Sequence, residues 1–134
     1  SPAALEVARV NAGRMKIADR VQIVLSDLFE HITPSFDLIA ANLPYIPTKT
    51  LSGLPVSRFE PHLALDGGPD GLEVIRKFLN EAQEHLRPSG IILMEIESDQ
   101  GDAVIELARS RWEKGNIRLL DDYAGLPRVV IIQS

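Results

Sequence analysis

The stretch Phe36-Asp37-Leu38-Ile39-Ala40-Ala41-Asn42-Leu43-Pro44-Tyr45 decides the fold, because an apolar run gives way there to a turn-forming segment. Residues 36–41 have the length and continuity of a buried parallel strand, and Asn42 ends this strand. Residues 43–69 then carry five of the nine prolines and no sustained hydrophobic period. A loop this long inside a compact domain is usually functional, and ligands of open α/β sheets bind beyond the carboxyl ends of strands. We therefore expect the functional site directly after Asn42.

The residues before this strand predict one helix and one further strand. Ser1 can cap a helix whose first position is Pro2, and alanines and a leucine recur there at helical spacing. Residues 21–25 form a short β-branched run that predicts a second buried strand.

The residues after the long loop alternate between helical and strand patterns. Asp70 and Glu73 resemble a capping box, and the apolar period that follows continues to Leu86 before Pro88 and Gly90 end it. Strands are predicted for residues 91–96, 117–120 and 129–132, and a further helix for residues 100–112. This alternation indicates an α/β fold with a doubly wound sheet.

Composition narrows the classes of function. The 134 residues fit one domain, and 14 Lys and Arg against 19 Asp and Glu leave a formal charge of −5. This balance lacks the basic excess with which nucleic-acid binders neutralise phosphates, so we expect no direct nucleic-acid partner. The chain has no cysteine, no apolar run long enough for a membrane span and no histidine arrangement typical of a metal site. We expect a cytoplasmic protein that uses neither a membrane nor a metal.

The tetrapeptide Asn42-Leu43-Pro44-Tyr45 has the groups needed to methylate an amide or aromatic amino nitrogen. Such a nitrogen is a poor nucleophile because its lone pair is delocalised. Two fixed acceptors, the Asn42 side-chain oxygen and the Leu43 carbonyl, would orient its N–H groups and stabilise the positive charge that develops during transfer. Pro44 would stiffen the turn, and the Tyr45 ring would pack against the planar target. The alternative is that the tetrapeptide is only a turn.

The tetrapeptide is similar to the Asn-Pro-Pro-Tyr signature of amino-group N-methyltransferases, and residues 59–72, FEPHLALDGGPDGL, resemble the segment that follows it in the HemK/PrmC family of release-factor glutamine methyltransferases. The resemblance covers essentially the whole chain. Two positions depart from the family pattern: Leu43 stands where the family has Pro, and Glu97 where it usually has Gly. Asn-Leu-Pro-Tyr also resembles the signature of ribosomal RNA adenine dimethyltransferases.

The resemblance implies a class I S-adenosylmethionine-dependent methyltransferase with a Rossmann-like sheet. It further implies that residues 1–134 are the C-terminal part of one catalytic domain, without its first two strands and their Gly-rich cofactor turn. The Gly-rich residues 66–71 follow no strand, so we interpret them as a turn. Asn42, Leu43, Pro44 and Tyr45 would be catalytic and substrate-binding. Asp27 would accept from the adenine amino group of S-adenosyl-L-methionine and Leu28 would pack on its ring, with Asn42 also at the cofactor.

The implied reaction is N5-methylation of a glutamine side chain, and the implied partner is a peptide chain release factor. Two other functions stay open: an adenine-N6 methyltransferase acting on RNA or DNA, and a catalytically silent fragment. For the chain as it stands, the resemblance predicts a four-stranded core in the order 36–41, 91–96, 129–132 and 117–120. Residues 1–30 would be displaced, poorly ordered or paired with a second copy, and the exposed edge at residues 36–41 would allow self-association.

Overall fold

The computed structural model describes all 134 residues, and they divide into two compact units, Ser1–Pro34 and Ser35–Ser134. The first unit holds α1 (Pro2–Arg14), followed by turns and extended chain. Ser1 occupies the N-cap position, as predicted, but its side chain makes no capping hydrogen bond. Of the residues in α1, only Ala12 is buried.

The prediction of a strand at residues 21–25 is wrong. These residues belong to no strand, and Val21 and Leu25 are exposed. A strand exists only where its backbone N–H and C=O groups bond to a neighbouring strand, and no strand of the sheet pairs with this run. Residues 1–30 therefore lie outside the sheet, in agreement with the expectation of a four-stranded core.

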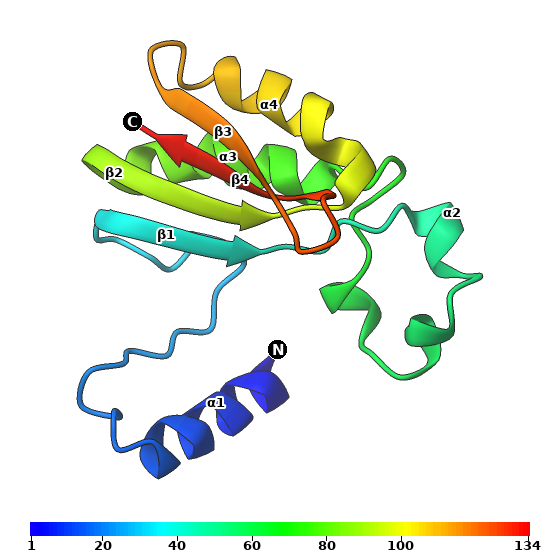
Figure 1. The fold of residues 1–134 in the computed structure, drawn as a ribbon. Helices are drawn as coiled ribbons and strands as arrows, with labels where there is room; N and C mark the ends of the chain where they lie inside the picture. The colour runs from blue at the N-terminus through cyan, green and yellow to red at the C-terminus, as the bar shows by residue number, and fades with distance from the viewer. The chain divides into compact units, whose positions relative to one another are not determined.

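The second unit is built on a four-stranded sheet that consists of β1 (Phe36–Asn42), β2 (Leu86–Glu95), β3 (Asn116–Asp121) and β4 (Pro127–Gln133). The strand order is β1-β2-β4-β3, which confirms the predicted order (Figure 1). β1 and β2 run parallel, whereas β4 is antiparallel to both of its neighbours. The sheet is therefore mixed, with a parallel pair at the end that carries Asn42.

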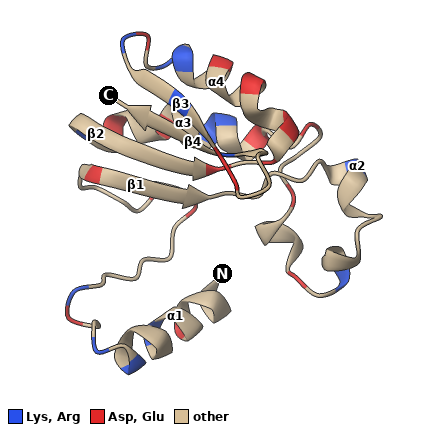
Figure 2. Cartoon of the chain, in the orientation of Figure 1, with Lys and Arg blue, Asp and Glu red and all other residues tan.

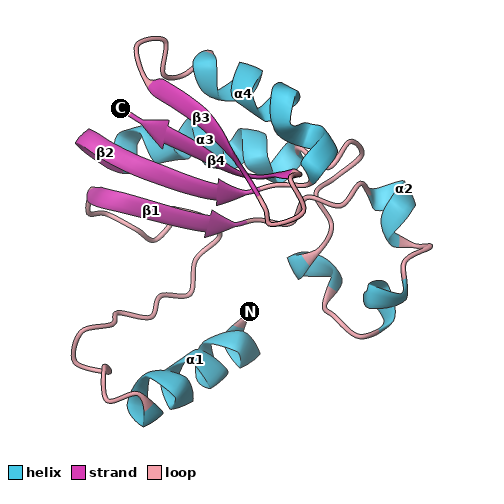
Figure 3. Ribbon diagram, in the orientation of Figure 1, coloured by secondary structure: helices cyan, strands magenta, loops and turns pink.

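Two helices, α3 (Glu73–His85) and α4 (Gly101–Arg109), lie against the sheet (Figure 3), and both bury apolar side chains, such as Ile75 of α3 and Val104 of α4. Alternate residues of the sheet are fully buried, whereas the residues between them are less so; the fully buried side chains include Ile92, Met94, Val130 and Ile132. Each such side chain contributes about 1.5 to 3 kcal/mol on burial. Trp112, just after α4, is also buried.

The sheet is less protected at β1. β1 lies at an edge of the sheet, and Leu38 is 54% exposed. Self-association through this edge stays a prediction. No helix of the chain is both long and apolar enough to cross a bilayer.

The prediction of a capping box formed by Asp70 and Glu73 is wrong. Leu72 is the N-cap of α3, and its apolar side chain makes no capping hydrogen bond. Asp70 instead accepts a 3.1 Å hydrogen bond from the backbone N–H of Leu72, and the N–H of Glu73 donates to the carbonyl of Gly67. The Asp side chain closes the turn before the helix because the chain reverses at Gly71, where φ is +77°.

The ends of two other elements also differ from the prediction. β2 begins at Leu86 rather than at residue 91, with an irregularity in its pairing with β1 before Ile91. The helix predicted for residues 100–112 is shorter: a 3-10 turn, η3 (Ser98–Gln100), precedes α4, which ends at Arg109. Ends of helices are often 3-10 turns, which the hydrophobic period does not distinguish.

Candidate functional site

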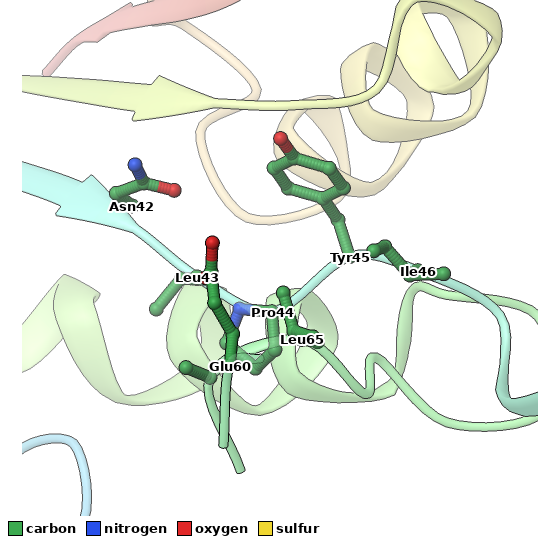
Figure 4. Close-up of a pocket in the computed structure, with 8 residues that line it drawn as sticks. Asn42, Leu43, Pro44, Tyr45, Ile46, Glu60 and Leu65 are labelled. Carbon is green, nitrogen blue, oxygen red and sulfur yellow. The ribbon is translucent and has the colours of Figure 1, made fainter. Parts of the chain in front are cut away.

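The site lies where the parallel pair of strands ends. Asn42 is the last residue of β1 and is paired in register with Glu95, the last residue of β2. The chain then continues through Leu43, Pro44 and Tyr45 along a cavity of about 350 Å³. The cavity is lined by residues 42–46 and by Glu60, Ala64 and Leu65 of the long loop. Figure 4 shows most of these side chains. The structure thus brings all four residues of the tetrapeptide to one cavity.

Glu95 connects the two polar side chains of the tetrapeptide. The Asn42 side-chain nitrogen donates to Oε2 of Glu95 at 3.1 Å, and the Tyr45 hydroxyl donates to Oε1 at 3.2 Å. Burial and the adjacent Glu95 carboxylate raise the pKa of Tyr45 above its ordinary value. The Tyr45 hydroxyl therefore keeps its proton and remains a donor.

Two acceptors of the tetrapeptide have no partner in the protein. Asn42 uses its nitrogen for Glu95, and its oxygen Oδ1 accepts no hydrogen bond from the protein. The Leu43 carbonyl also accepts none. An acceptor from the side chain and an acceptor from the main chain are therefore available at the same turn for a ligand that carries N–H groups.

The long loop returns to the tetrapeptide through backbone contacts. It contains three short helices, α2 (Thr48–Leu51), η1 (Pro55–Arg58) and η2 (His62–Ala64). At its end, the N–H of Ile46 donates to the carbonyl of Leu65, and the N–H of Gly67 donates back to the carbonyl of Ile46. Ile46 and Asp66 form an isolated parallel β-bridge, so backbone hydrogen bonds join the two ends of the loop.

Gly67 and Gly71 allow this close approach. A Cβ on Gly67 would lie 2.8 Å from the Tyr45 Cα, and a Cβ on Gly71 would overlap the Tyr45 carbonyl oxygen. The space beside Gly67 is filled by protein backbone, and the space beside Gly71 by the Tyr45 carbonyl and the side chains of Gln100 and Pro47. Residues 66–71 are therefore a bracing turn, as interpreted from the sequence, and hold the tetrapeptide in place.

Gln100 is the buried polar side chain behind this turn, with 7% of its surface exposed. Its Nε2 donates to the Tyr45 carbonyl at 3.0 Å and to the Gly71 carbonyl at 3.3 Å, and its Oε1 accepts from the Glu97 N–H at 3.2 Å. All hydrogen-bonding groups of the side chain are used. Gln100 thereby links η3, the bracing turn and the tetrapeptide.

Glu97, which departs from the family pattern, has a structural role here. Its Oε1 accepts from the N–H of Ser98 at 3.0 Å and completes a capping box with Gln100 at the start of η3. The same oxygen lies 3.7 Å from Nη1 of Arg128, and the other terminal nitrogen of that guanidinium, Nη2, lies 3.6 Å from Oδ2 of Asp122. Glu97 therefore stabilises the turn that carries Gln100 and connects it to β4.

The cavity has little positive charge. Glu60 is the only charged residue in its lining, and its side chain extends toward the turn after Asn42 (Figure 4). Lys and Arg positions are interspersed with acidic ones along α3 and α4 (Figure 2). An RNA or DNA backbone would require basic side chains beside the cavity.

The residues predicted at the cofactor belong to different units of the chain. Asp27 and Leu28 lie in the first unit, in a turn where the Asp27 carbonyl accepts from the N–H of Glu30. Leu28 has a φ of +46°, which is uncommon for a branched residue. Asn42 lies in the second unit, so a joint site of these three residues stays a prediction.

Sequence reasoning missed two residues of the site as functional candidates, Glu95 and Gln100. Glu95 lies near the end of the strand predicted for residues 91–96. Parallel pairing of this strand with residues 36–41 would have placed Glu95 opposite Asn42. Gln100 carried no local signal, since its partners are 55 and 29 residues away in the chain.

The fold is that of class I S-adenosylmethionine-dependent methyltransferases. A crystal structure of TrmN from Thermus thermophilus superimposes with a TM-score of 0.64 at 17% identity, over 100% of this chain and 34% of that chain. The structure of a protein-(glutamine-N5) methyltransferase (release factor-specific) from Alicyclobacillus acidocaldarius has a TM-score of 0.51 at 22% identity, over 78% of this chain and 51% of that chain. At these identities, the likeness concerns the fold alone.

Sequence comparison is more specific. A release factor glutamine methyltransferase from Moorella thermoacetica is 48% identical over 130 residues, which are 96% of this chain and 46% of the relative. The chain belongs to the family of release factor glutamine methyltransferases, HemK/PrmC. It spans about half the length of the curated relatives that it matches. No protein-family model matches the chain.

Proposed function

We propose that this chain provides the acceptor side of the active site in an enzyme that methylates the N5 nitrogen of a glutamine side chain in a peptide chain release factor. The observation that carries the proposal is the pair of open acceptors at one cavity, Asn42 Oδ1 and the Leu43 carbonyl. The names of the relatives support the same substrate.

A primary amide presents two N–H groups in one plane, and two acceptors can hold both of them. In this arrangement Asn42 and Leu43 fix the nitrogen and stabilise the positive charge that develops on it during methyl transfer. Because Leu43 acts through its main-chain carbonyl, a leucine serves where the family has proline. The Tyr45 ring packs beside the planar amide, and its hydroxyl is held by Glu95.

S-adenosyl-L-methionine is the proposed donor, and when bound it supplies an electrophilic methyl group on a positively charged sulfur. The chain's own contributions to its binding are Asp27 at the adenine amino group, Leu28 at the adenine ring and Asn42 near the methyl. The Gly-rich residues 66–71 do not fit a cofactor cradle, since the Tyr45 backbone lies against Gly67 and Gly71 and the Glu73 side chain lies against Gly68. We therefore propose that residues preceding this part of the catalytic domain supply the Gly-rich turn.

The lining of the cavity favours a protein substrate over a nucleic acid. Glu60 is its only charged residue, so the cavity would repel a phosphate backbone close to the target base. A glutamine side chain on an exposed loop carries no such charge.

Methylation of a release factor by the full-length protein tests the proposal. Mass spectrometry of the release factor after incubation with S-adenosyl-L-methionine should show one added methyl group on a glutamine. Asn42→Ala should lower the single-turnover rate by about a hundredfold or more, because it removes one of the acceptors, while the affinity for S-adenosyl-L-methionine changes much less. Methylation of ribosomal RNA instead of the release factor would contradict the proposal, and normal turnover of Asn42→Ala would refute the role of Asn42.

A further inference from the structure

We infer that Glu95 is a positioning residue that fixes which way the Asn42 amide faces. This inference rests on the proposed function, in which the Asn42 oxygen must face the substrate. The relevant observation is that the two oxygens of the Glu95 carboxylate are shared between Asn42 and Tyr45.

An asparagine amide is nearly symmetric in shape but not in chemistry. One end donates and the other accepts, and a half-turn about the terminal bond exchanges them at little steric cost. Asn42 is exposed at the end of an edge strand, so packing alone does not choose between the two orientations. In the wrong orientation, the amide would present N–H groups to the N–H groups of the target.

Glu95 removes this ambiguity because a carboxylate only accepts hydrogen bonds. The Asn42 nitrogen lies 3.1 Å from Oε2 of Glu95, and Figure 4 shows the Asn42 oxygen turned toward the gap between the end of β1 and Tyr45. The paired register of Asn42 and Glu95 at the ends of two parallel strands fixes the distance between the side chains. The oxygen is thus directed toward the substrate before the substrate binds.

Tyr45 makes the arrangement sensitive to the chemistry of residue 95. Its hydroxyl donates to Oε1 of Glu95 at 3.2 Å, so this oxygen is already occupied. In Glu95→Gln, the remaining oxygen would stay with Tyr45, and the new amide nitrogen would face Asn42. Two donors would then meet, and Asn42 would turn its oxygen toward residue 95 and away from the substrate.

A reciprocal exchange of donor and acceptor tests this inference. Glu95→Gln should lower the single-turnover methylation rate of the full-length protein by at least about tenfold. Asn42→Asp should also be slow at neutral pH, because it places two carboxylates side by side. The double variant Asn42→Asp with Glu95→Gln restores one donor facing one acceptor, now with the donor at residue 95, and it leaves an oxygen of residue 42 facing the substrate. Its rate should exceed that of both single variants, a rescue that a merely structural role would not produce.

Asp37→Asn is the matched control, since it changes a carboxylate to an amide at the other end of β1, where Asp37 pairs with Arg87. Its rate should stay within about twofold of the wild type. A double variant as slow as the slower single variant, or Glu95→Gln with the wild-type rate, would overturn the inference. If Asn42→Ala is inactive while Glu95→Gln is normal, the positioning role fails and the proposed function stands.

A measurement on the unmodified protein covers the case in which a variant does not fold or no methylation is observed. The side-chain amide protons of Asn42 should exchange with water at least about ten times more slowly than those of Asn11, which is exposed on α1. Equal exchange rates would show that the Asn42 nitrogen is not held by Glu95, whatever the activity of the protein.

Discussion

The carbonyl oxygen of Tyr45 accepts a 3.0 Å hydrogen bond from Nε2 of Gln100, a side chain that belongs to a turn 55 residues further along the chain. The same nitrogen reaches the carbonyl of Gly71, so one buried amide holds two backbone segments. The position of the tetrapeptide therefore depends on these hydrogen bonds from Gln100 as well as on the rigidity that Pro44 gives the turn.

Gly71→Ala should damage this packing. The new methyl group would overlap the Tyr45 carbonyl and crowd Gln100, at a residue whose φ is +77°. We expect the free energy of unfolding to fall by about 3 kcal/mol, measured by chemical denaturation. Gly125→Ala is the matched control, because Gly125 has a φ of +79° but no atom within 4 Å of an added Cβ, so it should cost only about 1 kcal/mol. Equal losses in the two variants would mean that the contact with Tyr45 is unimportant.

Leu43→Pro should leave methylation intact or raise its rate. The Leu43 carbonyl is unpaired and remains in place, and the substitution supplies the residue that the family has there. The measurement is turnover on a release factor compared with turnover on ribosomal RNA. A large loss on the release factor would show that the turn at residues 42–45 does not act as proposed.

Asp70 should make stability depend on acid pH. Hydrogen bonding to Arg76 lowers the pKa of Asp70 from 3.8 to about 2. A carboxyl with a lowered folded-state pKa stabilises the fold above its unfolded pKa and loses that contribution as the pH falls toward about 2. In Asp70→Asn, the decrease in Tm between neutral pH and a pH of about 2 should therefore be smaller. Glu113 is an exposed carboxyl that forms no ion pair, so Glu113→Gln should keep the wild-type decrease.

The isolated chain should bind S-adenosyl-L-methionine weakly. Its Gly-rich turn braces Tyr45 and leaves no cradle for a cofactor. We expect an affinity at least a hundredfold below that of the full-length protein, a difference of about 2.7 kcal/mol. Calorimetric titration measures both affinities. Micromolar binding by the isolated chain would mean that residues 1–134 already contain a complete cofactor site.

The strands of the second unit could be predicted because each has an apolar core that is flanked by turn residues, as Asn42 flanks β1. Their order could be predicted only from the resemblance to the family. The run at residues 21–25 has the same local pattern, yet it forms no strand because pairing depends on a neighbour that local sequence cannot supply. The capping box was predicted wrongly for a related reason. The N–H of Glu73 donates to the carbonyl of Gly67, because a turn at Gly71 brings that carbonyl close to the start of α3.

The four residues of the tetrapeptide could be predicted as a group because they are contiguous. The side chains that hold them could not, since Glu95 and Gln100 act across the sheet and across a turn. The role of Glu97 also required the structure, because its capping bond depends on the 3-10 turn at Ser98.

The bridge between Ile46 and Asp66 closes residues 47–65 into a loop whose two ends are tied together beside the cavity. Insertions or deletions within this loop would alter its outer surface without moving Asn42, since loop length adds only slowly to the entropy of closure. The outer surface of residues 47–65 can therefore change in sequence and length while the turn at residues 42–45 keeps its geometry.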